Sequence, residues 1–169
     1  GWREEIAALA REIGDGDLKR AAEFSIDATE GAYLAALGPG GFVSARAAGY
    51  QRGLDPGKNM ADVSGFYSAF AFVPEREDPA DHAAVEAGFV GYLCVKEAFA
   101  RTSGDTEAAE LTQDARSQFI PLHLGPLIAG MNERMKNGGP IHVQLAVGVA
   151  HRMCGAIPAP VAVIEEDGE

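Results

Sequence analysis

Apolar side chains recur along the chain every three or four positions, and strict alternation of apolar and polar residues is nearly absent. The clearest stripe begins at Val85 and continues through Phe89, Tyr92, Leu93 and Phe99. This spacing places the five side chains on one face of an α-helix, whereas a half-buried strand would alternate. The pattern therefore predicts an all-α fold, a single-domain helical bundle.

The same periodicity predicts further helices, and glycine, proline and capping residues suggest their ends. Helices are expected over 2–13, 17–37, 42–52, 60–72, 79–102, 105–127 and 141–157. Asp17 is the expected N-cap of the second helix. Pro79 is expected in the first turn of its helix, where its missing N–H has no partner to lose. Pro121 and Pro126 are expected to interrupt or kink the helix that contains them.

Charge narrows the choice of partners. The chain has 169 residues, enough for one domain over 1–169 with an acidic tail from about 158, and it carries a formal charge of −11. Such a surface repels nucleic acid and anionic membranes, and it suits a basic peptide or protein segment. No apolar run approaches the ~20 residues of a membrane span, so we expect no stable membrane insertion.

Cysteine usage indicates the compartment. Cys94 and Cys154 lie 60 positions apart in apolar stretches, with no CxxC and no zinc-site spacing. We expect both to be buried free thiols, which fits a reducing compartment, and we expect a cytoplasmic protein.

One cluster carries residue types suited to chemistry. Asp81 and His82 follow Pro79, and Glu86 lies one helical turn after His82, so His82 and Glu86 share a helix face. With His123 they could ligate a metal or transfer protons. A small helical metal-dependent enzyme using His82, Glu86 and His123 is therefore the alternative function. The simpler interpretation is that Asp81 caps the helix and His82 is a satisfied surface residue. No HExxH, GxSxG or phosphate-loop motif is present, so neither a hydrolase nucleophile elbow nor a phosphate-binding loop is indicated. We expect a non-enzymatic protein without a cofactor, on the resemblance described below.

An aromatic set, Phe66, Tyr67, Phe70 and Phe72, precedes this cluster. Such residues form a core most often, but they could also line a groove for an apolar peptide. Both roles need the same side chains, so the pattern leaves them open.

Three stretches together resemble a known family. They are Tyr-Leu-Ala-Ala-Leu-Gly-Pro-Gly over 33–40, the aromatic helix with Pro-Ala-Asp-His over 66–93, and Phe-Ile-Pro-Leu-His-Leu-Gly-Pro-Leu over 119–127. In order and spacing they are similar to the TorD/NarJ-like (TorD/DmsD) molybdoenzyme maturation chaperones. Ala71 stands where that family usually has glycine, and Leu127 where it often has tryptophan.

The resemblance implies a TorD-like all-α chaperone in the cytoplasm, a monomer or dimer without a cofactor. It would bind the twin-arginine signal peptide or the apo form of a molybdopterin enzyme of the DMSO reductase family, and assist cofactor insertion before export or assembly. A structural subunit of a larger oxidoreductase is a further alternative. The residues expected to bind the client are Tyr67, Phe70, Pro79, Asp81, His82, Glu86, Phe119, His123 and Pro126. Of these, Asp81, His82 and His123 are expected to matter more for client binding than for stability.

Overall fold

All regular secondary structure in the described part of the chain is helical. The computed structural model describes residues 2–50, 53, 55–75 and 78–155. In chain order the elements are α1 (Trp2–Ile13), α2 (Gly16–Ser25), α3 (Glu30–Leu37), the 3₁₀ turn η1 (Ala47–Gly49), α4 (Pro56–Ala69), α5 (Ala83–Thr102), α6 (Thr106–Phe119), the π-helical turn η2 (Ile120–Leu124), α7 (Gly125–Met135) and α8 (Ile141–Gly155). The only extended pairing within these residues is an isolated bridge between Arg46 and His82. The predicted all-α class is confirmed.

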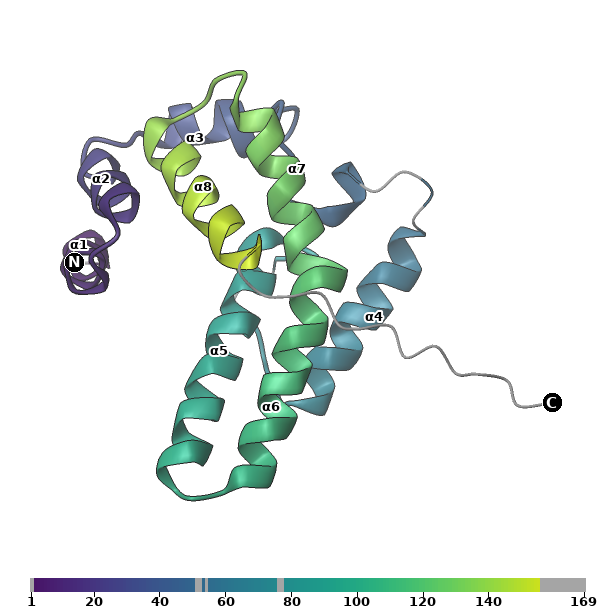
Figure 1. The fold of residues 1–169 in the computed structure, drawn as a ribbon. Coiled ribbons are helices and arrows are strands. Elements are labelled where there is room, and N and C mark those ends of the chain that lie inside the picture. The colour runs from purple at the N-terminus through teal and green to yellow at the C-terminus, as the bar shows by residue number, and fades with distance from the viewer. Residues whose placement is uncertain (1, 51–52, 54, 76–77, 156–169) are drawn as a thin grey trace.

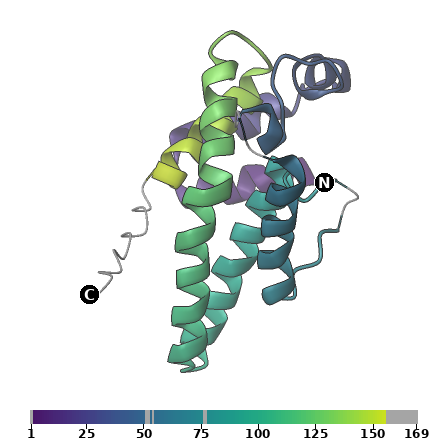
Figure 2. The same ribbon diagram turned by 90° about the vertical axis from the view of Figure 1, so that its right-hand side faces the viewer.

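Two helical hairpins set the architecture. Helices α6 and α7 form a nearly continuous column through η2, with α5 alongside α6 and α8 alongside α7 (Figures 1 and 2). Helix α2 packs on α8, and α1 packs on α2. The far end of the α5–α6 hairpin extends away from α7 and α8 in both views. Helix α4 lies beside the column, near the middle of the molecule.

Aromatic and aliphatic side chains from α4, α5, α6, η2, α7 and α8 meet in one core. Phe89 of α5 and Phe119 of α6 are fully buried, and their ring centroids lie 4.8 Å apart in an edge-to-face arrangement. Edge-to-face contact is a favoured geometry for aromatic pairs. The core comprises Val43, Val63, Tyr67, Ala83, Val85, Phe89, Leu93, Ala115, Phe119, Leu124, Leu127, Ile128, Met131, Met135 and Val147.

Several predicted helix boundaries are wrong, and the caps explain why. Asp15, not Asp17, caps α2, because its carboxylate accepts the N–H groups of residues 17 and 18 at 2.9 Å. The helix expected over 17–37 is two helices, since Thr29 caps a new one by accepting the N–H of Ala32. The helix expected over 42–52 is only the turn η1, with 51–52 outside the described residues.

The start of α5 also differs from the prediction. Pro79 lies in the connection before the helix, which begins at Ala83. His82 is the N-cap: its Nδ1 accepts the N–H of Ala84 at 3.2 Å. The interpretation of Asp81 as the cap is therefore wrong.

Further corrections concern the cysteines. Cys94 is exposed on α5 and Cys154 is half-buried on α8, so burial of Cys94 is a wrong prediction. The acidic tail expected from about 158 lies outside the described residues.

The turn that ends α4 contains a left-handed residue. Ala71 has a φ of 55°, a value that residues other than glycine rarely adopt. The turn is held by the Tyr92 hydroxyl and the Lys96 ammonium, which donate to the Phe70 carbonyl at 3.0 and 3.3 Å. The backbone at position 71 thus adopts a conformation that favours glycine. Glycine is also the residue that the resembling family usually has at this position.

We expect Ala71→Gly to raise the free energy of unfolding by about 0.5–1 kcal/mol, because the strain of a left-handed alanine, ~1–2 kcal/mol, exceeds the added entropy of the unfolded chain. Urea unfolding measures the difference. The matched control is Ala98→Gly, at an exposed position inside α5, which should lower stability by about 1 kcal/mol. Equal destabilisation by both changes would contradict the strain at position 71.

Candidate functional site

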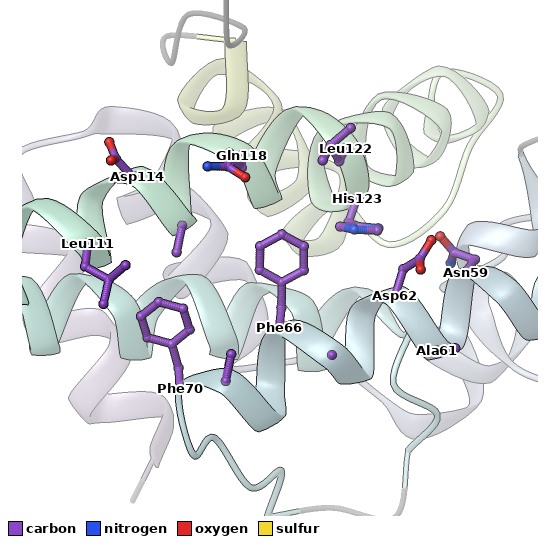
Figure 3. Close-up of a pocket in the computed structure, with 13 residues that line it drawn as sticks. Asn59, Ala61, Asp62, Phe66, Phe70, Leu111, Asp114, Gln118, Leu122 and His123 are labelled. Atoms are coloured by element: carbon purple, nitrogen blue, oxygen red, sulfur yellow. The ribbon is translucent and has the colours of Figure 1, made fainter.

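The main candidate site is a groove of about 780 Å³ between α4 and α6, whose α6 wall continues into η2. Phe66 and Phe70 project from α4 toward α6, and Leu111 extends from α6 toward Phe70 (Figure 3). The residues that line the groove are Asn59, Ala61, Asp62, Gly65, Phe66, Ala69, Phe70, Leu111, Asp114, Ala115, Gln118, Leu122 and His123.

Large aromatic side chains separate α4 from α6 and so keep the groove open. The ring of Phe66 lies 5.2 Å from that of Phe119 and 5.6 Å from that of His123, edge to face in both cases. On the neighbouring face of α4, Tyr67 is buried and its hydroxyl donates to the Ala80 carbonyl at 2.8 Å. Helix α4 is therefore anchored to the core by one face, while the adjoining face borders the groove.

Exposed apolar residues and carboxylates share the groove. Leu111 is 63% and Leu122 55% exposed, although their spacing with Phe119 predicts one buried face. Asp62 and Asp114 are exposed on opposite walls, and neither forms an ion pair with another described residue. The groove thus combines apolar surface with unpaired negative charge.

His123 lies at the η2 end of the groove. It is almost fully buried, and its Nδ1 has no hydrogen-bond partner among the described residues. Burial lowers the pKa of this imidazole, and the charge of Asp62 opposes that effect. The histidine therefore favours the neutral form and adds no positive charge to an otherwise acidic groove.

The Pro79–His82 connection is anchored to the loop before η1. Asp81 is fully buried, and its Oδ1 accepts from Arg46 Nε at 2.9 Å and Nη2 at 2.8 Å. Main-chain bonds reinforce this pair, since Ala83 N–H donates to the Ala45 carbonyl at 2.8 Å and Ala47 N–H to the Asp81 carbonyl at 3.3 Å. Asp81 therefore joins the Pro79–His82 connection to this loop, and its role in client binding stays a prediction.

Glu86 is a buried carboxyl without a cation. Neither of its oxygens has a hydrogen-bond partner among the described residues, and its side chain has no solvent exposure. Burial, and then the charge of Asp81, raise its pKa to about 8. Glu86 in turn raises the pKa of the buried Tyr67 and of the half-buried Cys154, after the larger effect of burial in each case. Glu86 therefore lies inside the molecule as a carboxylic acid near neutral pH.

The residues predicted from the sequence to bind the client occupy different places. Phe70 and His123 line the α4–α6 groove, whereas Pro79, Asp81, His82 and Glu86 do not. Tyr67 and Phe119 belong to the core, and Pro126 is half-buried at the start of α7. Client binding by these residues outside the groove stays a prediction. Sequence reasoning left the groove role of Phe66 open, and it missed Asp62, Asp114 and the two exposed leucines.

The geometry gives no support to the metal alternative. Within the described residues, no three His, Cys, Asp or Glu side chains come together as potential metal ligands. His82 Nδ1 is occupied by the helix cap, and His123 lines the groove without Glu86. In the same part of the chain, no helix is both long and apolar enough to cross a bilayer.

Comparison with known proteins adds no assignment. No family model matches the chain, and no curated protein matches it. The resemblance to the TorD/NarJ-like chaperones therefore stays a prediction.

Glu86 makes stability depend on pH. Its carboxyl keeps a proton in the folded state up to about pH 8 but loses it near pH 4.5 when unfolded, so the free energy of unfolding falls as pH rises between these values. From pH 5 to pH 7.5 the loss is about 3 kcal/mol. We expect Glu86→Gln to flatten this slope in urea unfolding, and the exposed control Glu110→Gln to leave it unchanged. Equal slopes in wild type and Glu86→Gln would contradict the burial of an acid there.

The Arg46–Asp81 pair has one buried and one partly exposed partner. We expect Arg46→Ala to lower the free energy of unfolding by about 2 kcal/mol, between the ~1 kcal/mol of surface pairs and the 3–5 kcal/mol of buried ones. Adding Asp81→Asn should recover part of the loss, because it removes the unpaired buried charge. The control Lys136→Ala breaks an exposed pair with Glu133 and should change stability by less than about 0.5 kcal/mol.

Proposed function

We propose that this protein is a cytoplasmic maturation chaperone for a molybdopterin enzyme, and that the α4–α6 groove binds the client segment. The observation that carries the proposal is the groove itself, where exposed leucines and aromatic rings lie beside unpaired carboxylates. The twin-arginine signal peptide named by the family resemblance combines basic and apolar residues. The apo form of the enzyme is the other partner that the resemblance implies.

Apolar contact and charge have separate roles in this proposal. Burial of Leu111, Leu122 and Phe70 against the client supplies most of the affinity, because apolar area removed from water contributes about 25 cal/mol per Å². Asp62 and Asp114, on a chain with a formal charge of −11, attract and orient a basic segment. The binding energy is thus assigned to the apolar residues of the groove and the orientation to its two carboxylates.

We expect a synthetic twin-arginine leader to bind at low salt, and Leu111→Ser and Leu122→Ser each to weaken binding by about ten-fold in calorimetry. Both leucines are more than half exposed, so neither change should lower stability. Val95→Ser removes an equally exposed residue of α5 outside the groove and should bind normally.

Charge variants complete the test. Asp62→Asn and Asp114→Asn should weaken binding at 0.1 M salt and reduce its salt dependence, since charges are screened over about 10 Å there and about 3 Å at 1 M. Asp27→Asn makes the same charge change at an exposed site outside the groove and should have little effect. Leader binding that survives both leucine changes would place the client elsewhere on the protein.

A further inference from the structure

The solvent-facing side of α5 carries no charge over about four helical turns. Every exposed residue from Ala84 to Phe99 is an alanine, glycine, cysteine, valine or phenylalanine. Val95 is 69% and Phe99 73% exposed. A surface helix ordinarily presents charged and polar residues to water. These exposed residues, called the outer side of α5 below, therefore have the composition of a contact surface.

The charged residues of α5 in this range are engaged on its other sides. Glu86 is buried. Glu97 pairs with Arg116 at 2.8 Å, and Lys96 donates to the Phe70 carbonyl at 3.3 Å. The whole chain has a formal charge of −11, so two copies repel each other over much of their surfaces. On the outer side of α5 they can meet without bringing like charges into contact.

The outer side of α5 is large at one end and small at the other. Val95 and Phe99 lie in its C-terminal half, and Gly88 and Gly91 in its N-terminal half. A Cβ atom built at Gly91 would meet no atom within 4 Å, and one at Gly88 would meet only Phe72, at 3.8 Å. Glycine inside a helix costs about 1 kcal/mol relative to alanine, and no contact within the described chain requires it at either position. The two glycines therefore leave open space beside the helix.

We propose that two copies of this chain form a dimer in which α5 packs antiparallel against α5, about a two-fold axis near Cys94. Val95 of each copy then lies against Gly91 of the other. Phe99 of each copy lies against Gly88 of the other. A two-fold contact requires such a self-complementary surface, and a parallel pair would instead place large residues against large ones. None of these residues lines the α4–α6 groove, so the inference does not rest on the proposed function.

Hollows at both ends extend this surface. Val95 and Phe99 border a hollow of about 480 Å³ between α5 and α6, which Lys96 also lines. Gly88 borders a hollow of about 540 Å³ beside the connection before α5, which Glu75 also lines. Antiparallel packing brings the Phe99 end of one copy to the Gly88 end of the other, so the ammonium of each copy approaches the carboxylate of its partner. The far end of the α5–α6 hairpin extends away from α7 and α8 (Figures 1 and 2), which leaves it accessible.

The size of the surface predicts a weak dimer. From residue 84 to residue 99 the helix is about 23 Å long, and at a width of about 10 Å it offers roughly 250 Å² per copy. The hollows add to this area, and a standard interface buries about 800 Å² per copy. We therefore expect a dissociation constant of about 10–100 μM.

Sedimentation equilibrium from about 1 μM to about 500 μM tests the association. The mass should rise from 17.7 kDa toward twice that value as the concentration increases. A mass that stays at 17.7 kDa over the whole range overturns the proposal.

Variants test the place of contact. Phe99→Lys and Gly91→Leu should each raise the dissociation constant of the dimer by at least about ten-fold. Neither should lower the temperature of unfolding, because Phe99 is mostly exposed and the space beside Gly91 is open. The matched controls are Leu122→Lys and Gly65→Leu, an exposed leucine and an exposed helical glycine of the α4–α6 groove, and they should dimerise normally. A dimer that both α5 changes leave intact lies on another surface and overturns the proposal.

Cys94 reports on the position of the axis. It is exposed on the outer side of α5, whereas Cys154 is half-buried on α8. Two Cys94 thiols near a two-fold axis lie close together, so a short bismaleimide should join two copies of the wild type and of Cys154→Ser but not of Cys94→Ser. Phe99→Lys keeps Cys94 and should reduce the cross-linked product by at least about ten-fold, in line with its weaker association. Equal cross-linking of the wild type and Phe99→Lys would arise from random collision and overturns the proposal.

Discussion

The packing of aromatic rings around Phe89 and Phe119 determines where α4 lies, and the groove depends on it. Tyr67 packs 4.9 Å from Phe89, and Phe66 packs 5.2 Å from Phe119, so two adjacent residues of α4 contact two helices at once. The rings of Phe66 and Tyr67 hold α4 away from α6, and the groove lies beside them, where α4 carries the small residues Ala61, Gly65 and Ala69. Removing a ring would therefore change the width of the groove as well as the stability of the core, which couples the two properties in one set of side chains.

The helices could be predicted from the sequence because apolar residues recur every three or four positions along them. In α5 this stripe is buried at Val85, Phe89 and Leu93, whereas the stripe of α1 (Ile6, Leu9 and Ile13) is exposed. The ends of the helices could not be predicted, because several side chains near each end could cap the helix. Only the folded backbone selects one of them. Asp15 and Asp17 are both possible caps, and Asp15 is used. The connection before α5 is held by the ion pair of Arg46 and Asp81. These two residues are 35 positions apart in the sequence, so no local sequence pattern indicates where α5 begins.

The candidate site was only partly predictable for a similar reason. Phe66 and Leu122 have the composition and spacing of core residues, and their position at a groove follows from which helices approach them. Phe70 was identified as a possible groove residue from the aromatic set, and the family resemblance assigned a client-binding role to His123. The resemblance also places glycine at position 71, where the backbone is left-handed. The burial of Glu86 had no signal in the sequence, since a glutamate one turn into a helix is ordinarily solvated.

Glu86 also changes how the charge of the protein acts. The formal charge of −11 counts it as ionised, yet a pKa of about 8 keeps it mostly protonated at pH 7, so the effective charge is nearer −10. The buried carboxyl lies behind α4, close to Tyr67, whereas Asp62 and Asp114 are exposed in the groove. Attraction of a basic segment is therefore assigned to the exposed carboxylates. By about pH 8 the stability that the proton of Glu86 gives the fold at low pH is lost, and the charge that forms then lies in the core rather than in the groove.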